Sequence, residues 1–374
     1  MRPSRKPICV LHLRDSPWVD GPGRTILETG VHIDPERVEF HIGALVPEVD
    51  APHPLVNASR ERKLHVHAIE DRGGLRNGIV DRIADLIRSI GADVVHTSEF
   101  RSNVIGALVA RRCDVLHVAT VHGWIANDAR GRVFRFLDKV LLRTCDRTIF
   151  VSHAIRRLVP RWWISDERGP VLHNALVLET YGTEYLDAPR RRAGEDGRIN
   201  LLKVGRLSPE KGHALLLEAF ASVAREHAGL HLLLAGTGPL EGELRLHVAR
   251  LGLQDRVEFL GFIHDMPSLY ARTDLVVQSS YTEGLPNVIL EAAYLGVPIL
   301  ATRVGGTDEV IGEGRGGELI APGSASEIES GIRRFLADPE KYADMAARAR
   351  EHIVSSFSFQ ARTERLMRIY EDLV

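Results

Sequence analysis

The chain has 374 residues, enough for two domains of ordinary size, and its 44% hydrophobic and 26% charged residues are typical of a soluble globular protein. A formal net charge of −2 gives no global basis for nucleic-acid binding. The three cysteines, Cys9, Cys113 and Cys145, lack metal-ligand spacing and do not indicate a disulfide framework. The apolar run at 8–11 is too short for a signal peptide, and no stretch approaches the ~20 apolar residues of a membrane span. We therefore expect a cytoplasmic protein.

The first half alternates predicted strands with predicted helices. Strands are expected at residues 8–13, 38–46, 64–69, 93–96, 115–121 and 148–151, and helices at 75–90, 103–110 and 133–142. Gly91 is expected to end the first of these helices, and Ser152 is a plausible N-cap of a further one. Residues 47–63 show no firm period. The alternation indicates a parallel α/β sheet.

Two features of this half are candidate site elements. Gly21 and Gly23 lie between the first strand and a helix expected to start at Thr25, where glycines let the backbone approach a ligand. An ordinary tight turn is the alternative, because the spacing is not the six-residue dinucleotide fingerprint. His122 follows the strand that ends at Val121, and ligands of open α/β sheets gather at such positions. A surface or packing role is the alternative, since the chain has 17 histidines.

A basic segment follows. It contains Arg130, Arg132, Arg135, Lys139, Arg143, Arg147, Arg156, Arg157 and Arg161, with Trp162 and Trp163 adjacent. Basic residues beside aromatic ones are consistent with contact with an anionic lipid surface. A solvated helix face is the commoner explanation and is favoured here.

Residues 187–198 are polar, without an apolar period, and are the best linker in the chain. The alternation then restarts, with strands expected at 199–204, 230–235, 256–260, 275–278 and 297–301 and helices at 328–336, 342–353 and 357–370. Two doubly wound α/β domains in tandem are predicted, with a ligand cleft between them.

The loop at 205–212 carries two cations next to a predicted helix start. Ser208 would be the N-cap and Pro209 the first helical residue, so that Arg206 and Lys211 flank the helix N-terminus. Cations do not stabilise a helix dipole at that end. A bound diphosphate would explain them.

Residues 283–291 read as a loop followed by a helix that Pro286 and Asn287 open. Glu283 lies in the loop and Glu291 about one turn inside the helix. The helix N-terminus suits an anion, and carboxylates beside it can accept hydrogen bonds from sugar hydroxyls. The alternative is that Glu283 caps the helix and Glu291 is a solvated helix residue.

Together these motifs resemble retaining glycosyltransferase family 4, of GT-B fold. Glu283-Gly-Leu-Pro-Asn-Val-Ile-Leu-Glu291 is similar to that family's two glutamates with seven residues between them, and Gly205-Arg206 with Glu210-Lys211-Gly212 resembles its diphosphate-binding loop. The turns at 236–239 and 257–261 resemble those lining the nucleotide. The resemblance is strong from about residue 199 onward. Before that it rests on Gly21/Gly23, on 120–123 and on 150–153.

The resemblance implies a role for each matching residue. Arg206 and Lys211 would neutralise the donor diphosphate. Glu283 would bind the transferred sugar, and Glu291 the ribose. The implied donor-binding set is Gly21, Gly23, Arg206, Lys211, Gly236, Ile263, Glu283, Gly284, Leu285, Pro286, Asn287 and Glu291, and the implied catalytic set is His122, Arg206, Lys211 and Glu283. No metal or other cofactor is expected.

The implied domains are residues 1–186 for the acceptor and 187–356 for the nucleotide sugar, with a terminal helix at 357–374 that packs back on the first. The implied activity is retaining transfer from a nucleotide-diphosphate sugar to a hydroxyl of a glycan, glycolipid or small molecule, in bacterial polysaccharide or glycoconjugate synthesis. The protein would be cytoplasmic, with peripheral contact with the inner face of the membrane as an option and no nucleic-acid partner. Alternatives are a GT-B-fold nucleotide-sugar epimerase or hydrolase, and a non-catalytic two-lobed binding protein.

An acid–nucleophile pair of glutamates fits less well. A retaining glycosidase needs its carboxyl groups about 5–5.5 Å apart. Eight helical residues would span roughly 12 Å. Glu283 and Glu291 are therefore interpreted as two binding groups, and no covalent intermediate on either glutamate is expected.

Overall fold

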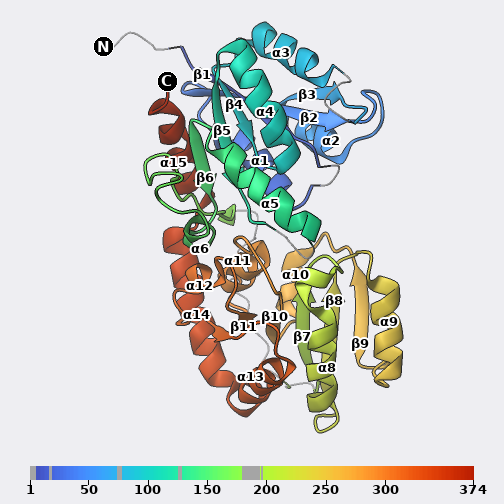
Figure 1. Ribbon diagram of the computed structural model, residues 1–374. Coiled ribbons are helices and arrows are strands. Elements are labelled where there is room, and N and C mark those ends of the chain that lie inside the picture. The colour runs from blue at the N-terminus through green and yellow to red at the C-terminus, as the bar shows by residue number, and fades with distance from the viewer. Residues whose placement is uncertain (1–5, 17–18, 74–77, 125–128, 179–193, 195–196) are drawn as a thin grey trace. The chain divides into compact units, whose positions relative to one another are not determined.

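The structure is a computed structural model that describes residues 6–16, 19–73, 78–124, 129–178, 194 and 197–374 (Figure 1). The chain forms two compact units. Unit 1 comprises Met1–Ala175 and Phe359–Val374, and unit 2 comprises Leu176–Ser358. The predicted domain boundary at 186/187 and most of the predicted linker at 187–198 lie outside the described residues. That boundary and the cleft expected between the domains stay predictions.

Unit 1 is built on a six-stranded parallel sheet of order β3-β2-β1-β4-β5-β6. Its strands are β1 (Ile8–Arg14), β2 (Val38–Val46), β3 (His65–Glu70), β4 (Val94–Thr97), β5 (Leu116–Val121) and β6 (Arg147–Phe150). The inner strands are almost wholly buried, which explains why they read as apolar runs rather than as alternating patterns.

Helices cover both faces of this sheet. Residues of α1 (Gly21–His32), α2 (Pro54–Glu61) and the C-terminal α15 (Phe359–Glu371) share one core with the sheet. Residues of α3 (Ile79–Ile90) and α4 (Phe100–Cys113) share a second core on the sheet. The helices α5 (Ala129–Leu142) and α6 (His153–Arg157) complete the unit. The chain thus returns to unit 1 at its C-terminus (Figure 1).

Unit 2 repeats this plan with a six-stranded parallel sheet of order β12-β11-β10-β7-β8-β9. Its strands are β7 (Ile199–Val204), β8 (Leu230–Ala235), β9 (Val257–Gly261), β10 (Leu275–Gln278), β11 (Ile299–Thr302) and β12 (Glu318–Ile320). The core of one face includes residues of α8 (His213–Ala224), α9 (Glu241–Arg250) and α13 (Ala325–Ala337). The remaining helices are η2 (Pro209–Lys211), α10 (Met266–Ala271), α11 (Asn287–Tyr294), α12 (Thr307–Val310) and α14 (Pro339–Ser356), with α11 packed against α14.

Both sheets change direction of strand order between their first and fourth strands, which are β1 and β4 in unit 1 and β7 and β10 in unit 2. At such a switch point the loops leaving the two strands diverge to opposite faces and leave room for a ligand. Three candidate site residues of unit 2, Arg206, Lys211 and Glu283, follow β7 and β10.

The prediction of two doubly wound α/β domains is confirmed. The strands β2, β7, β8 and β10 have the predicted bounds, and Gly91 ends α3 in the left-handed region at φ 65°. The helix α2 was not predicted, since it falls in the stretch without a firm period. The predicted start of the α3 segment at 75–77 lies outside the described residues. Among the helices the structure describes, none is long and apolar enough to cross a membrane.

Candidate active site

The switch point of unit 2 brings together two residues that are 72 positions apart in the sequence. Lys211 follows β7 and Glu283 follows β10, and Lys211 Nζ lies 2.7 Å and 2.9 Å from the two carboxylate oxygens of Glu283. Ser280 Oγ donates a hydrogen bond of 2.7 Å to Glu283 Oε1. The carboxylate is thus held by a cation and a hydroxyl. The alternative that Glu283 caps the following helix is wrong, because Pro286 occupies the N-cap position.

The start of the helix after β7 differs from the prediction. Ser208 and Pro209 open only the short 3-10 helix η2, and Ser208 makes no side-chain capping bond. The α-helix α8 begins at His213, after Gly212 in the left-handed region at φ 66°. A Cβ on Gly212 would lie 2.1 Å from the Ser279 carbonyl oxygen, so close packing of the two loops forces this break. Arg206 is exposed on the same loop.

A buried layer beneath these loops escaped the sequence reasoning. Lys203, in β7, is buried, and its Nζ lies 3.5 Å from Ser280 Oγ. Burial lowers the pKa of Lys203 to about 7, although Glu283 acts in the opposite direction. Neither ring nitrogen of the buried His213 has a hydrogen-bond partner among the described residues, and burial lowers its pKa to about 3. The sequence signal that could have indicated this layer is Lys203 itself, a lysine inside the apolar strand predicted at 199–204.

Glu291 lies in α11 and is only 6% exposed. Its carboxylate accepts a hydrogen bond of 3.1 Å from the hydroxyl of Tyr270, in α10. The alternative that Glu291 is a solvated helix residue is therefore wrong. The two glutamates have different partners, as expected for two binding groups. Pro286 and Asn287 open α11, as predicted.

The other predicted donor residues of unit 2 lie on neighbouring turns. Gly236 follows β8, and a Cβ there would lie 2.0 Å from the Gly205 carbonyl oxygen, so only glycine fits this contact between the loops. Ile263 follows β9 and is half-buried. Gly284 accepts a hydrogen bond from the Gly306 amide, and Leu285 is buried.

In unit 1, Gly21 and Gly23 lie in the first turn of α1, not in a loop before a helix starting at Thr25. The reason is Asp20, the N-cap, whose carboxylate accepts a hydrogen bond of 3.0 Å from the Gly23 amide. The same oxygen lies 2.7 Å from Nη2 of the buried Arg14.

The loops after β1 and β4 are joined by Arg14. Its Nη1 lies 2.7 Å from Glu99 Oε1, and Glu99 is the N-cap of α4. Burial and a hydrogen bond with Asp15 raise the pKa of Glu99 to about 8. The switch point of unit 1 is thus occupied by the buried Arg14 guanidinium, which lies between the side chains of Asp20 and Glu99.

A cavity of about 370 Å³ opens beside these residues. It is lined by Pro22, Ser98, Glu99, Phe100, Asn103, Thr120, Val121, His122, Gly123, Trp124, Phe134, Arg135 and Asp138. His122 therefore lies on the cavity wall, together with Val121 and Gly123 on either side of it in the chain. Trp124 Nε1 and Asn103 Nδ2 donate hydrogen bonds of 2.7 Å and 3.0 Å to the buried Asp138.

His122 is held as a neutral imidazole. Burial and the two cations Arg14 and Arg362 lower its pKa to about 3. Behind it, the buried His96 forms hydrogen bonds with Thr120 Oγ1 at 2.7 Å and with the Tyr370 hydroxyl at 2.6 Å. A neutral histidine can donate and accept hydrogen bonds, but it is a weak base at neutral pH.

Known protein families match both units. A model of glycosyl transferases group 1 matches residues 188–352, and a model of glycosyltransferase family 4 matches residues 19–180. The chain belongs to the group 1 glycosyltransferases of family 4. This glycosyltransferase is 27% identical to spore coat protein SA of Bacillus subtilis over 368 residues, covering 88% of this chain and 94% of the relative. It is 34% identical to alpha-D-kanosaminyltransferase of Streptomyces kanamyceticus over 186 residues, covering 49% of this chain and 48% of the relative.

Solved structures agree on the fold. The glycosyltransferase superposes on Anabaena HepE in complex with UDP-glucose with a TM-score of 0.82 at 23% identity, covering 98% of this chain and 99% of the other. Sucrose-phosphate synthase from Thermosynechococcus elongatus gives a TM-score of 0.82 at 19% identity, covering 98% and 99%. The predicted GT-B fold is confirmed.

Proposed function

We propose that this glycosyltransferase moves a sugar from a uridine diphosphate sugar to a hydroxyl acceptor, with retention at the anomeric carbon. The observation that carries the proposal is the contact between Lys211 and Glu283 at the switch point of unit 2. An ammonium group can neutralise a diphosphate and a neighbouring carboxylate can accept a hydrogen bond from a sugar hydroxyl, which supports the proposal. UDP-glucose in the HepE structure supports the choice of nucleotide.

In this proposal each donor residue acts on a part of the nucleotide sugar. As the bond from the anomeric carbon to the phosphate oxygen breaks and the acceptor oxygen bonds to that carbon, negative charge grows on the leaving diphosphate, whose oxygen takes the proton of the acceptor hydroxyl. Lys211, the exposed Arg206 and the amides at the start of α11 stabilise that charge. Glu283 accepts hydrogen bonds from the transferred sugar, and Glu291 from the ribose. Lys211, Arg206 and the α11 amides supply the positive charge that the diphosphate requires, so the reaction is proposed to need no divalent metal.

The acceptor hydroxyl is proposed to bind in the cavity of unit 1. Its wall combines the aromatic rings of Phe100 and Trp124 with polar groups, a combination that suits a sugar or another small polyol. Because the pKa of His122 is lowered to about 3, His122 is proposed to orient a hydroxyl by hydrogen bonding rather than to act as a general base. We propose that the enzyme is cytoplasmic and that it takes part in bacterial polysaccharide or glycoconjugate synthesis at the inner face of the membrane.

The decisive experiment compares Lys211→Ala with Lys341→Ala, a control at an exposed lysine of α14. With UDP-glucose and a panel of acceptors, we expect kcat to fall at least ~10²-fold in Lys211→Ala, as for removal of a stabilising group from a transition state, and to be unchanged in the control. Release of free sugar or of an epimer by the wild type would favour the hydrolase or epimerase. Binding without turnover would favour the non-catalytic protein.

Stereochemistry gives a second readout of the same reaction. The configuration of the new glycosidic bond, identified by NMR of the anomeric proton, is expected to match the configuration of the donor. A mass-spectrometric search for a glycosyl adduct on Glu283 or Glu291 is expected to find none. An inverted product or such an adduct would rule out the proposed mechanism.

Peripheral membrane contact is proposed through α5. The helix exposes the large apolar residues Val133, Phe134, Phe136, Leu137 and Val140. Arg135, Lys139 and Arg143 accompany them, and Leu158 and Trp162 are also exposed. A solvated helix face, the explanation favoured from the sequence, would not expose so many large apolar side chains. The side chains of Arg130 and Arg132 lie outside the described residues.

Vesicle sedimentation tests this contact. The full-length protein is expected to bind phosphatidylglycerol vesicles and to bind phosphatidylcholine vesicles much less, because Lys and Arg near the surface attract anionic lipid. Phe136→Asp is expected to weaken this binding. Leu246→Asp, which changes an exposed leucine of α9, is expected not to. Equal binding by wild type and Phe136→Asp would contradict the proposal.

A further inference from the structure

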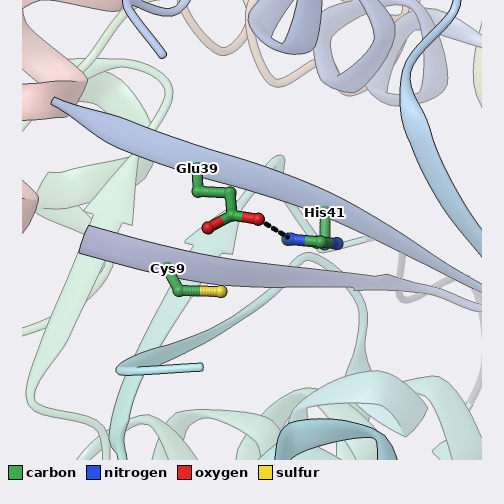
Figure 2. Close-up of side chains that lie close together, drawn as sticks. All are labelled: Cys9, Glu39 and His41. Atoms are coloured by element: carbon green, nitrogen blue, oxygen red, sulfur yellow. Dashed lines mark hydrogen bonds and ion pairs between the residues drawn. The ribbon is translucent and has the colours of Figure 1, made fainter. Parts of the chain in front are cut away.

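Three potential metal ligands lie close together near the amino ends of β1 and β2, at the end of the unit 1 sheet opposite to the switch-point loops. Cys9, in β1, is the register partner of Glu39 in β2, and His41 lies two residues further along β2 on the same face. The Cys9 Sγ, a carboxylate oxygen of Glu39 and a ring nitrogen of His41 all lie within 4.8 Å of one another. Figure 2 shows the cysteine on one strand and the other two side chains on its neighbour.

The geometry of this cluster is close to that of a tetrahedral zinc site. With Zn–S near 2.3 Å and Zn–N or Zn–O near 2.0–2.2 Å, ligand atoms of such a site are about 3.4–3.6 Å apart. His41 Nε2 is already 3.1 Å from Glu39 Oε1. The Cys9 sulfur lies within 4.8 Å of both other ligand atoms, so zinc binding requires it to approach them by up to about 1.3 Å. Thiolate, imidazole and carboxylate together are a donor set that suits Zn²⁺ rather than Mg²⁺ or Ca²⁺.

The surroundings of His41 provide a second observation. Its other ring nitrogen, Nδ1, lies 3.0 Å from Nε2 of His67, in β3. A metal-bound histidine usually donates its second ring N–H to an acceptor, which fixes the tautomer and turns the free lone pair toward the metal, and a neutral His67 can be that acceptor. If His41 Nδ1 donates to His67, the Nε2 lone pair faces the Glu39 carboxylate, and a cation between them would relieve the repulsion.

The protein-only explanation covers two of the three residues. A hydrogen bond from His41 to Glu39 accounts for their contact. It does not involve the buried Cys9 thiol, which donates a hydrogen bond of 3.6 Å to the Ile90 carbonyl oxygen and, within the described contacts, forms none with Glu39 or His41. The Glu39 side chain is 44% exposed, so an ion and a water ligand can enter from that side.

We propose that Cys9, Glu39 and His41 bind one Zn²⁺ ion, with water as the fourth ligand. Binding releases the thiol proton to solvent, and the thiolate and carboxylate then balance the charge of the ion. The site joins β1 to β2. Cys9 lies five residues before Arg14 in β1, or about 16 Å away at the rise of a strand, so the ion is structural and takes no part in sugar transfer.

Cobalt provides the direct test. Full-length protein, stripped of metal with a chelator and desalted, is titrated with Co²⁺ and then with Zn²⁺ as competitor. We expect one equivalent of Co²⁺ to bind with a thiolate-to-cobalt absorption band, and Zn²⁺ to abolish the band. Cys113→Ser, which changes the half-buried cysteine at the end of α4, is the matched control and should keep it. Cys9→Ser should lose it.

Two further variants keep the test informative if Cys9→Ser fails to fold. Glu39→Gln changes only the exposed ligand and is expected to weaken Zn²⁺ binding at least ~10-fold. His67→Gln removes the partner of His41 and is expected to weaken it by about 10- to 100-fold. The absence of a saturable equivalent in the wild type, or unchanged affinity in Glu39→Gln, would overturn the proposal.

Discussion

Single side chains at the switch point of unit 2 define what the candidate donor site can bind. Lys211 and Glu283 neutralise each other at 2.7 Å, and Ser280 links Glu283 to the buried Lys203. The site thus has the Lys211 ammonium group in contact with solvent and the buried Lys203 amine beneath it. Lys203 is the residue whose environment departs most from that of a free lysine, and the departure has a measurable consequence.

We expect Lys203 to make stability depend on pH. Its pKa is about 7 in the folded state and 10.5 as a free side chain, so between these values the unfolded chain binds more protons and stability rises with pH. From about pH 7.5 to about pH 9.5 the wild type should gain about 2–3 kcal/mol relative to Lys203→Met in urea unfolding. Lys341→Met, at an exposed position, should follow the wild type. Equal pH dependence of wild type and Lys203→Met would refute this assignment.

At the scale of elements, the C-terminal helix α15 is an integral part of unit 1. Arg37 binds Glu371 through Nε and Nη2 at 2.8 Å and 2.9 Å and Glu364 through Nη1 at 2.6 Å. The buried Tyr370 donates to or accepts from His96 Nδ1 in β4. Leu366 and Met367 enter the core that α1 and the sheet share. The helix therefore covers part of one face of the sheet of unit 1.

Removing the Tyr370 hydroxyl should loosen this helix. Tyr370→Phe leaves Nδ1 of the buried His96 without its partner, and such a loss costs about 1–3 kcal/mol. We expect a lower midpoint in chemical denaturation followed by tryptophan fluorescence, since all four tryptophans of the chain precede residue 176 and so belong to unit 1. Tyr281→Phe, at an exposed position in unit 2, is the control. A Tyr370→Phe protein as stable as the control would show that this hydrogen bond contributes nothing.

For the whole molecule, the important feature is that each unit has its own core. The cluster around Leu216, Phe220 and Ile332 belongs to unit 2, and the clusters on both faces of the other sheet belong to unit 1. A ligand that contacts only unit 2 should therefore stabilise unit 2 selectively. The proposed uridine diphosphate site is such a case.

We expect UDP at 100 times its Kd to stabilise unit 2 by about 2.7 kcal/mol. Hydrogen exchange should show slower exchange at residues 205–212 and 280–287, and the tryptophan signal of unit 1 should change little. The effect should be the same with and without added Mg²⁺, because Lys211 and Arg206 supply the charge. Protection confined to unit 1, or a requirement for Mg²⁺, would contradict the proposed donor site.

The sequence by itself determined the doubly wound α/β class and the spaced motifs of the family, because buried parallel strands read as apolar runs and because loops follow them in a fixed order. It also indicated Lys211, Glu283 and His122. It could not indicate that η2 and Gly212 delay the start of α8, since that break depends on a contact with Ser279 in a distant loop.

Only the tertiary structure decided which side chains meet. Lys211 meets Glu283 because β7 and β10 are neighbours in the sheet, although η2, three α-helices and two strands separate these two strands in the chain. Cys9 meets Glu39 and His41 for the same reason, because β1 pairs with β2 in register. Ligands from two strands leave no short spacing in the sequence, and the cysteines therefore gave no metal signal there. Sequence periodicity indicates which residues of one helix or strand are buried. The residues of a site come from several elements, and the order of strands in the sheet decides which of them are neighbours.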